Sequence, residues 1–148
     1  RHVVPSMNPP APTYQIRDAV ETDIPALASF LAPFFEKRHI LPRSEAELAT
    51  LIQHGFVCIL DDRIQGFAAI EVYSAKLAEV QSLAVSPGIQ GRGIGSELVR
   101  RCVQRAEELG VFELMAITAS EKLFQDLGFD YALPNQKRAI FYQTRPEK

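Results

Sequence analysis

The run Gln-Gly-Arg-Gly-Ile-Gly at residues 90–95 is the part of this sequence whose residue types and spacing point most directly to chemistry. It lies between an apolar, strand-like stretch and a long amphipathic helix pattern. Glycines allow positive φ angles and close approach to a ligand, so that successive N–H groups can converge on one anion. The first turn of the following helix adds free N–H groups and the positive end of the helix dipole. The run therefore predicts a loop that binds pyrophosphate.

Two better-known phosphate loops do not fit this run. A P-loop ends in Gly-Lys-Ser/Thr, whereas Gly95 is followed by Ser96 and Glu97, which argues against ATP hydrolysis. A dinucleotide fingerprint needs a third glycine where Leu98 stands. A plain glycine-rich turn before a helix is the other interpretation of these glycines taken alone.

The context of the loop resembles the acetyl-CoA-binding motif of the GNAT superfamily of N-acetyltransferases. A strand-like stretch at 79–85 and a turn at Ser86-Pro87 precede the pattern Q-x-x-G-x-G, which opens a helix. In that family the strand is splayed from its neighbour, and its backbone binds the pantetheine arm. The resemblance implies this role for Leu83 and Val85, with acetyl-CoA as co-substrate and no metal. The residues that it implies around the pyrophosphate are Gln90, Gly91, Arg92, Gly93, Ile94, Gly95 and Ser96.

The elements expected around this motif follow from periodicity and from cap residues. Thr22 or Asp23 can cap a first helix, and Ser44 with Glu47 forms a capping box for a second. Gly110 is the expected end of the helix over 93–109. Strands are expected at 14–17, 56–60, 64–73, 78–85, 111–118 and 138–143, with a short helix at 120–127. The order β-α-α-β-β-β-α-β-α-β predicts a mixed α/β sheet with splayed central strands, which is the GNAT layout.

Composition sets the remaining limits. With 148 residues and 47% hydrophobic residues, we expect one domain over 14–148 after a flexible, proline-rich segment at 1–13. A net charge of −2 gives no general reason to bind nucleic acid or a membrane. No apolar run approaches a membrane span, so a cytoplasmic location is expected. Cys58 and Cys102 are expected to be buried thiols. The oligomeric state stays open, a homodimer included.

A second resemblance indicates which class of molecule accepts the acetyl group. The segments 39–44 and 118–129 look like the catalytic domain of bacterial N-acetylglutamate synthases. That resemblance implies that Arg43, Lys137 and Arg138 hold the carboxylates of a small, acidic, glutamate-like amino acid. A guanidinium can bind a carboxylate through two parallel hydrogen bonds. The alternative is that these residues are ordinary solvated charges.

The reaction implied is attack of a neutral amine on a thioester, which needs a proton acceptor and stabilisation of the developing oxyanion. Glu79 occupies the place where many GNAT enzymes have a carboxylate base, and the backbone N–H of Leu83 is the candidate oxyanion donor. A plain strand glutamate, exposed or ion-paired, is the other interpretation of Glu79. The resemblance implies that Phe124 contacts the cofactor, at a place where many members have a tyrosine that protonates the leaving thiolate. Three tyrosines, Tyr73, Tyr131 and Tyr142, are spare candidates for that proton donor, with packing as their default role.

Two other functions remain open at this point. One is acetylation of a protein or peptide amine, which needs an open groove. The other is a sensor that binds acyl-CoA without turnover. The intact loop and Glu79 favour an enzyme, and the basic residues favour a small anionic acceptor.

Overall fold

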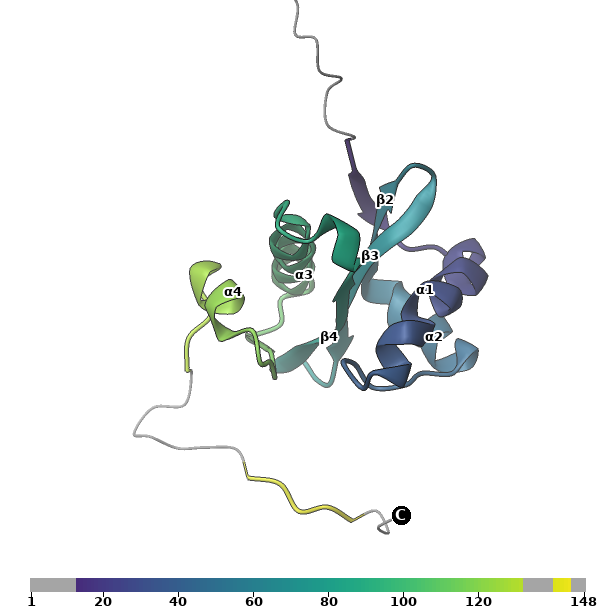
Figure 1. Ribbon diagram of the computed structural model, residues 1–148. Coiled ribbons are helices and arrows are strands. Elements are labelled where there is room, and N and C mark those ends of the chain that lie inside the picture. Colours follow the sequence, from purple (N-terminus) through teal and green to yellow (C-terminus); the bar gives the residue numbers. More distant parts are fainter. Residues whose placement is uncertain (1–12, 132–139, 145–148) are drawn as a thin grey trace, which may run out of the picture.

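A five-stranded mixed sheet with helices on both faces forms the body of the protein (Figure 1). The computed structural model describes residues 13–131 and 140–144, so residues 1–12 of the expected flexible segment lie outside it. The sheet order is β1-β2-β3-β4-β5, with antiparallel pairs except for the parallel pair β4–β5. The elements are β1 (Gln15–Asp18), α1 (Ile24–Glu36), α2 (Glu45–Leu51), β2 (Gly55–Leu60), β3 (Arg63–Val72), β4 (Leu77–Val85), α3 (Ile94–Leu109), β5 (Glu113–Met115) and α4 (Glu121–Asp126). The predicted mixed α/β fold is thus confirmed.

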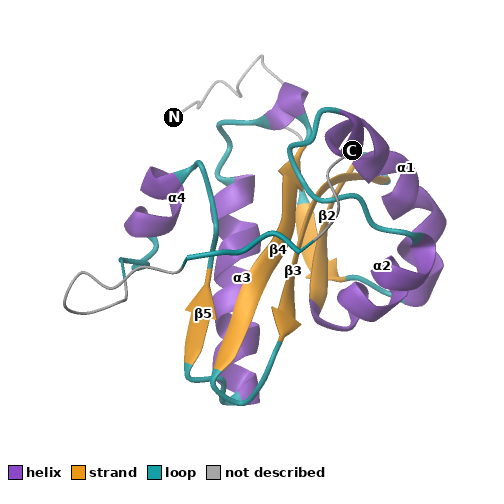
Figure 2. Cartoon of the chain, turned by 90° about the horizontal axis from the view of Figure 1, so that it is seen from below, coloured by secondary structure: helices purple, strands orange, loops and turns teal. Residues whose placement is uncertain are grey.

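The sheet separates two hydrophobic cores. On one face, α3 packs a stripe that includes Leu98 and Cys102 against the alternate residues of β2 and β3. On the other face, α1 and α2 pack Leu27, Leu31 and Leu48 against the intervening residues. Figure 2 shows α3 behind the sheet and α1 and α2 to the right of it. The alternation of strand side chains therefore decides which helices each residue meets.

Local signals account for the principal boundaries. The predicted capping box is present, since Ser44 Oγ accepts from Glu47 N at 3.1 Å and Glu47 accepts from Ser44 N at 2.8 Å. Helix α3 lies between two glycines in the left-handed region, Gly93 and Gly110. Asp23 is the N-cap residue of α1, but its side chain does not cap that helix. Its carboxylate instead pairs with Arg17 at 2.8 Å, so a side-chain partner replaces the expected cap.

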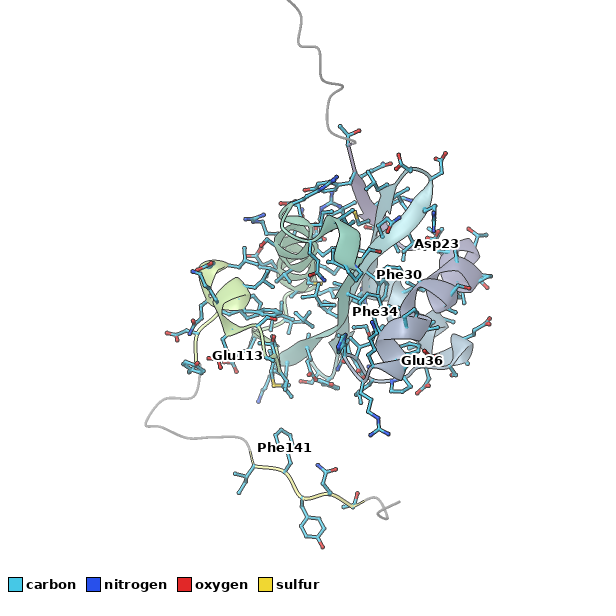
Figure 3. All side chains as sticks on the ribbon, viewed as in Figure 1. Asp23, Phe30, Phe34, Glu36, Glu113 and Phe141 are labelled. Atoms are coloured by element: carbon cyan, nitrogen blue, oxygen red, sulfur yellow. The ribbon has the colours of Figure 1, made fainter. Side chains whose placement is uncertain are left out.

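Two expectations at the C-terminal side of the sheet were wrong. The strand expected at 111–118 is limited to Glu113–Met115, and the described part of the strand expected at 138–143 is not in a strand. The side chains of Ile140, Phe141 and Tyr142 are 92%, 72% and 89% exposed, and Figure 3 shows Phe141 apart from the sheet. Strand preference in such a segment needs a partner backbone and a face to pack on, and β5 offers a ladder of three residues.

A β-bulge interrupts β4 at Ser82. Phe67 pairs with Ala84 and Ala69 pairs with Gln81, so Ser82 and Leu83 together oppose Ala68. Ser82 has a φ of 59°, an uncommon value for a residue other than glycine. Because of the extra residue, the side chains after the bulge alternate between the two faces of the sheet in the opposite phase to those before it.

Candidate functional site

The glycine-rich loop has the backbone shape expected of an anion site. Gly91 and Gly93 have φ angles of 88° and 79°, in the region that favours glycine. A Cβ atom added at either position would meet nothing within 4 Å, so conformation and not space requires glycine there. Helix α3 begins directly after Gly93, and the N–H groups of residues 94–96 precede the first backbone hydrogen bond of the helix, which Glu97 donates to Gly93. The acidic residue of that turn, Glu97, is paired with Arg100 at 2.7 Å.

Three of the predicted loop residues also stabilise the local structure. Gln90 Nε2 donates to the carbonyl oxygen of Val85 at 3.2 Å, which ties the loop to the end of β4. Ile94 is 1% exposed and anchors the start of α3 in the core, so its backbone alone can face a ligand. Gly95 lies beside Leu123, with 3.7 Å between an added Cβ and Leu123 Cδ1. Arg92 is exposed, and Ser96 is half-buried in the first turn of α3.

The strands β4 and β5 diverge where the resemblance predicted a splayed pair. Their pairing covers only Leu77–Glu79 with Glu113–Met115, and β4 continues to Val85 (Figure 2). Residues 80–85 therefore have strand β3 on one edge, and in the described part of the chain no strand on the other. Leu83 and Val85 pack on the α3 face beside this free edge. An extended ligand can pair with such an edge as an added strand.

A cluster of polar side chains lies on the opposite face of the sheet. Glu79 and Glu71 are directly opposite each other across β4 and β3. The Tyr73 hydroxyl donates to Glu79 Oε1 at 2.6 Å, and Gln81 Nε2 donates to the same hydroxyl at 3.4 Å. Tyr73 is 50% exposed, and the partial desolvation of its hydroxyl, with the Glu79 hydrogen bond as second cause, raises the pKa of Tyr73 to about 12. The phenol therefore stays protonated near neutral pH and acts as a donor.

Arg43 joins this cluster from the loop before α2. Its guanidinium Nη2 lies 3.6 Å from Glu71 Oε1, and its side chain is 15% exposed. That distance is longer than a hydrogen bond, so this contact leaves the guanidinium donors available. Arg43 therefore pairs with the residue that lies opposite Glu79 in the sheet. The other predicted substrate residues, Lys137 and Arg138, lie outside the described residues.

Two aromatic residues bear on these predictions, and the cofactor contact of Phe124 stays a prediction. Phe124, predicted on the cofactor side, is 5% exposed and meets Phe129 edge-on, with 5.1 Å between the ring centroids. Packing was the default expectation for Tyr73, but its hydroxyl binds Glu79. The signal for that contact was present in part. Tyr73 follows Glu71 by two residues, so both point to one face once the β3–β4 hairpin register is known.

The remaining candidates for chemistry are few. Cys58 and Cys102 are fully buried as predicted, and burial raises the pKa of the Cys102 thiol to about 12. Within residues 13–131 and 140–144, no group of three His, Cys, Asp or Glu side chains is placed to hold a metal ion. No helix in the described ranges is both long and apolar enough to span a bilayer.

Comparison with known proteins agrees with this geometry. The family model of the acetyltransferase (GNAT) family matches residues 24–129, which include α1, the splayed strand, the loop and α4. The chain belongs to the GNAT family. Its N-terminal and C-terminal remainders lie outside the matched range.

Relatives of this GNAT chain include amino-acid acetyltransferases. The amino-acid acetyltransferase of Neisseria meningitidis is 32% identical over 129 residues, which are 83% of this chain and 30% of the relative. The chain thus spans about a third of that relative's length.

Two solved structures are similar in fold. The N-acetylglutamate synthase of Neisseria gonorrhoeae, complexed with coenzyme A and N-acetyl-glutamate, has a TM-score of 0.70 and 31% identity, covering 82% of this chain and 29% of that one. Rv2747 of Mycobacterium tuberculosis, in complex with CoA, has a TM-score of 0.69 and 27% identity, covering 77% of this chain and 70% of that one.

Proposed function

We propose that this chain transfers the acetyl group of acetyl-CoA to the amine of a small, acidic, glutamate-like amino acid. The observation that carries the proposal is that Glu79, on the strand that leads to the glycine-rich loop, and Arg43, from the loop before α2, lie in one polar cluster. A proton acceptor and a carboxylate-binding cation are the two groups that an amino-acid acceptor requires. The similarity to an N-acetylglutamate synthase complexed with N-acetyl-glutamate supports the same acceptor class.

The glycine-rich loop and the free edge of β4 offer backbone hydrogen-bond donors that suit coenzyme A. The N–H groups of residues 91–96 would hold the pyrophosphate, and Arg92 would add positive charge at the exposed side of the loop. The free edge of β4 at Leu83 and Val85 would hold the pantetheine arm by backbone pairing. When bound, acetyl-CoA supplies an acetyl group activated as a thioester, and the thiolate of coenzyme A is a good leaving group. Phe124 cannot donate a proton to that thiolate, and we assign its protonation to water.

Glu79 would act on the acceptor. An amino acid carries its amine as an ammonium near neutral pH, and only the neutral amine can attack. Glu79 would take one ammonium proton, directly or through a water molecule. A nitrogen–carbon bond then forms to the acetyl carbonyl as the carbon–sulfur bond breaks. The backbone N–H of Leu83, beside the bulge, would stabilise the oxygen that gains negative charge.

Arg43 would set the acceptor class. A charge-assisted hydrogen bond contributes about 1.5–3 kcal/mol, so losing the carboxylate contact should weaken acceptor binding about 10- to 150-fold. Glu71 lies between Arg43 and Glu79 and holds the guanidinium on the acceptor face. The site therefore offers a cation for a carboxylate next to an acceptor for an ammonium proton.

The test is release of CoA thiol from acetyl-CoA by the purified chain, with glutamate, aspartate, neutral amino acids, simple amines and a peptide as separate acceptors. We expect glutamate-dependent release that falls at least about 100-fold in Glu79→Gln. Arg43→Gln should raise the KM for glutamate. Glu107→Gln and Arg63→Gln, which change exposed charges near the end of α3 and at the start of β3, should behave as wild type.

Other outcomes would redirect the assignment. Release with the peptide but with no amino acid would move it to a protein acceptor. Tight binding of CoA without release for any acceptor would indicate a sensor.

A further inference from the structure

Tyr73 is placed where it can control the proposed base. It follows β3 directly, and its backbone N–H donates to the carbonyl oxygen of Leu77 at 2.9 Å, which closes the β3–β4 hairpin. This bond fixes the backbone of Tyr73 opposite the start of β4. The side chain then reaches along the α1 and α2 face to the Glu79 carboxylate, at 2.6 Å.

We propose that Tyr73 is a positioning residue for Glu79 in acetyl transfer, an inference that rests on the proposed function. Its hydroxyl engages Oε1 of the carboxylate, which leaves Oε2 for the proton of the acceptor ammonium. Gln81 points its amide at the lone pairs of the same hydroxyl, at 3.4 Å. Because Gln81 donates to the hydroxyl oxygen, the hydroxyl hydrogen is directed to Glu79. The three side chains form a chain of donors that ends at the base.

The charges around Glu79 explain why a donor is useful there. Glu71 faces it from β3, and like charges directly opposite in a sheet repel. Arg43 pairs with Glu71, so its charge acts mainly on that residue. From β5, Met115 lies opposite Glu79, and Glu113, opposite Leu77, adds another acid. Tyr73 is thus a donor placed directly on a carboxylate that has acidic neighbours on both sides.

Substitution of Tyr73 by phenylalanine removes the hydroxyl and keeps the ring. We expect Tyr73→Phe to lower kcat about tenfold, because the Glu79 carboxylate loses the donor that holds it in place. The Kd for CoA and the KM for the acceptor should stay within about twofold of wild type. The matched control is Tyr131→Phe, which removes a hydroxyl that donates to Glu121, a glutamate outside the cluster.

A second measurement does not depend on turnover. Tyrosine ionisation followed at 295 nm after a rapid pH jump should show a component near pH 12 that is absent from Tyr73→Phe. Glu79→Gln should shift this component to lower pH, since the Glu79 carboxylate raises the pKa of Tyr73. Tyr131→Phe should leave it in place.

The outcomes separate the inference from the proposed function. If Glu79→Gln loses activity while Tyr73→Phe keeps the wild-type kcat, the inference is wrong and the base assignment stands. If Glu79→Gln keeps full activity, the base assignment fails and the inference fails with it. A component near pH 12 that does not respond to Glu79→Gln overturns the contact itself, whatever the activity.

Discussion

The two ends of α3 allow a paired test of the phosphate loop. Gly93 precedes the helix with a φ of 79°, and Gly110 follows it with a φ of 73°. A Cβ atom added at either glycine would meet nothing within 4 Å. Alanine at each position should therefore cause the same backbone strain without a steric clash.

The magnitude follows from that strain. A residue other than glycine in the left-handed region costs about 1–2 kcal/mol. In a chain of 148 residues this lowers Tm by about 2–4 °C for each kcal/mol, and we expect Gly93→Ala and Gly110→Ala to be alike in this respect. Thermal unfolding followed by circular dichroism would measure both losses.

Ligand binding should distinguish the two variants. In Gly93→Ala, the strained loop relaxes or the new methyl group points into the space that a phosphate would occupy, and at least one N–H contact to the phosphate is lost. A charge-assisted hydrogen bond of about 1.5–3 kcal/mol corresponds to CoA binding about 10- to 150-fold weaker. Gly110→Ala should bind CoA as wild type does.

Isothermal titration calorimetry with CoA provides the comparison. If Gly93→Ala loses the expected stability and still binds CoA with wild-type affinity, the loop does not hold the phosphates. If Gly110→Ala weakens CoA binding equally, the effect comes from the stability of α3 and not from the loop.

Three further predictions concern the framework around the site. Chemical denaturation of Ser44→Ala should show a free energy of unfolding about 1 kcal/mol lower than that of wild type. The control Ser120→Ala, at an N-cap without a side-chain hydrogen bond, should lower it by under about 0.5 kcal/mol. Equal losses would contradict the capping box. Leu98→Ala, at a fully buried position of α3, should lower the free energy of unfolding by about 3–5 kcal/mol. Leu109 is 45% exposed on the same helix, so Leu109→Ala should lower it much less. The pKa of the Cys102 thiol, raised by burial to about 12, predicts that it reacts with Ellman's reagent only after unfolding, and fast reaction of the native protein would show that this core opens.

The parts of the fold that sequence reasoning predicted are those with local causes. The glycines of the loop, the capping box of α2 and the end of α3 at Gly110 each depend on residues within one or two helical turns. Ser44 and Glu47 satisfy each other's backbone N–H groups, so the start of α2 needs no tertiary information.

The parts that sequence reasoning missed depend on pairing between strands. The Tyr73 hydrogen bond needs the β3–β4 register, in which Glu71 opposes Glu79, and residue types alone do not determine register. The segment Ile140-Phe141-Tyr142 has a strand-like composition, and strand preference depends on what lies beside the segment. The ion pair between Arg43 and Glu71 likewise requires α2 and its preceding loop to pack on the sheet.

The bulge at Ser82 explains how one strand can serve both halves of the reaction. Before the bulge, Ala78 and Val80 pack towards α3, so Glu79 between them faces α1 and α2. After it, Leu83 packs towards α3 and Ala84 towards the other face, the reverse of the earlier alternation. An unbroken strand would place residues 79 and 83 on the same face. The extra residue lets β4 present Glu79, the proposed base, to the polar cluster and then a free edge beside the glycine-rich loop. In the proposed reaction the two substrates would therefore meet at the bulge from opposite sides of the sheet.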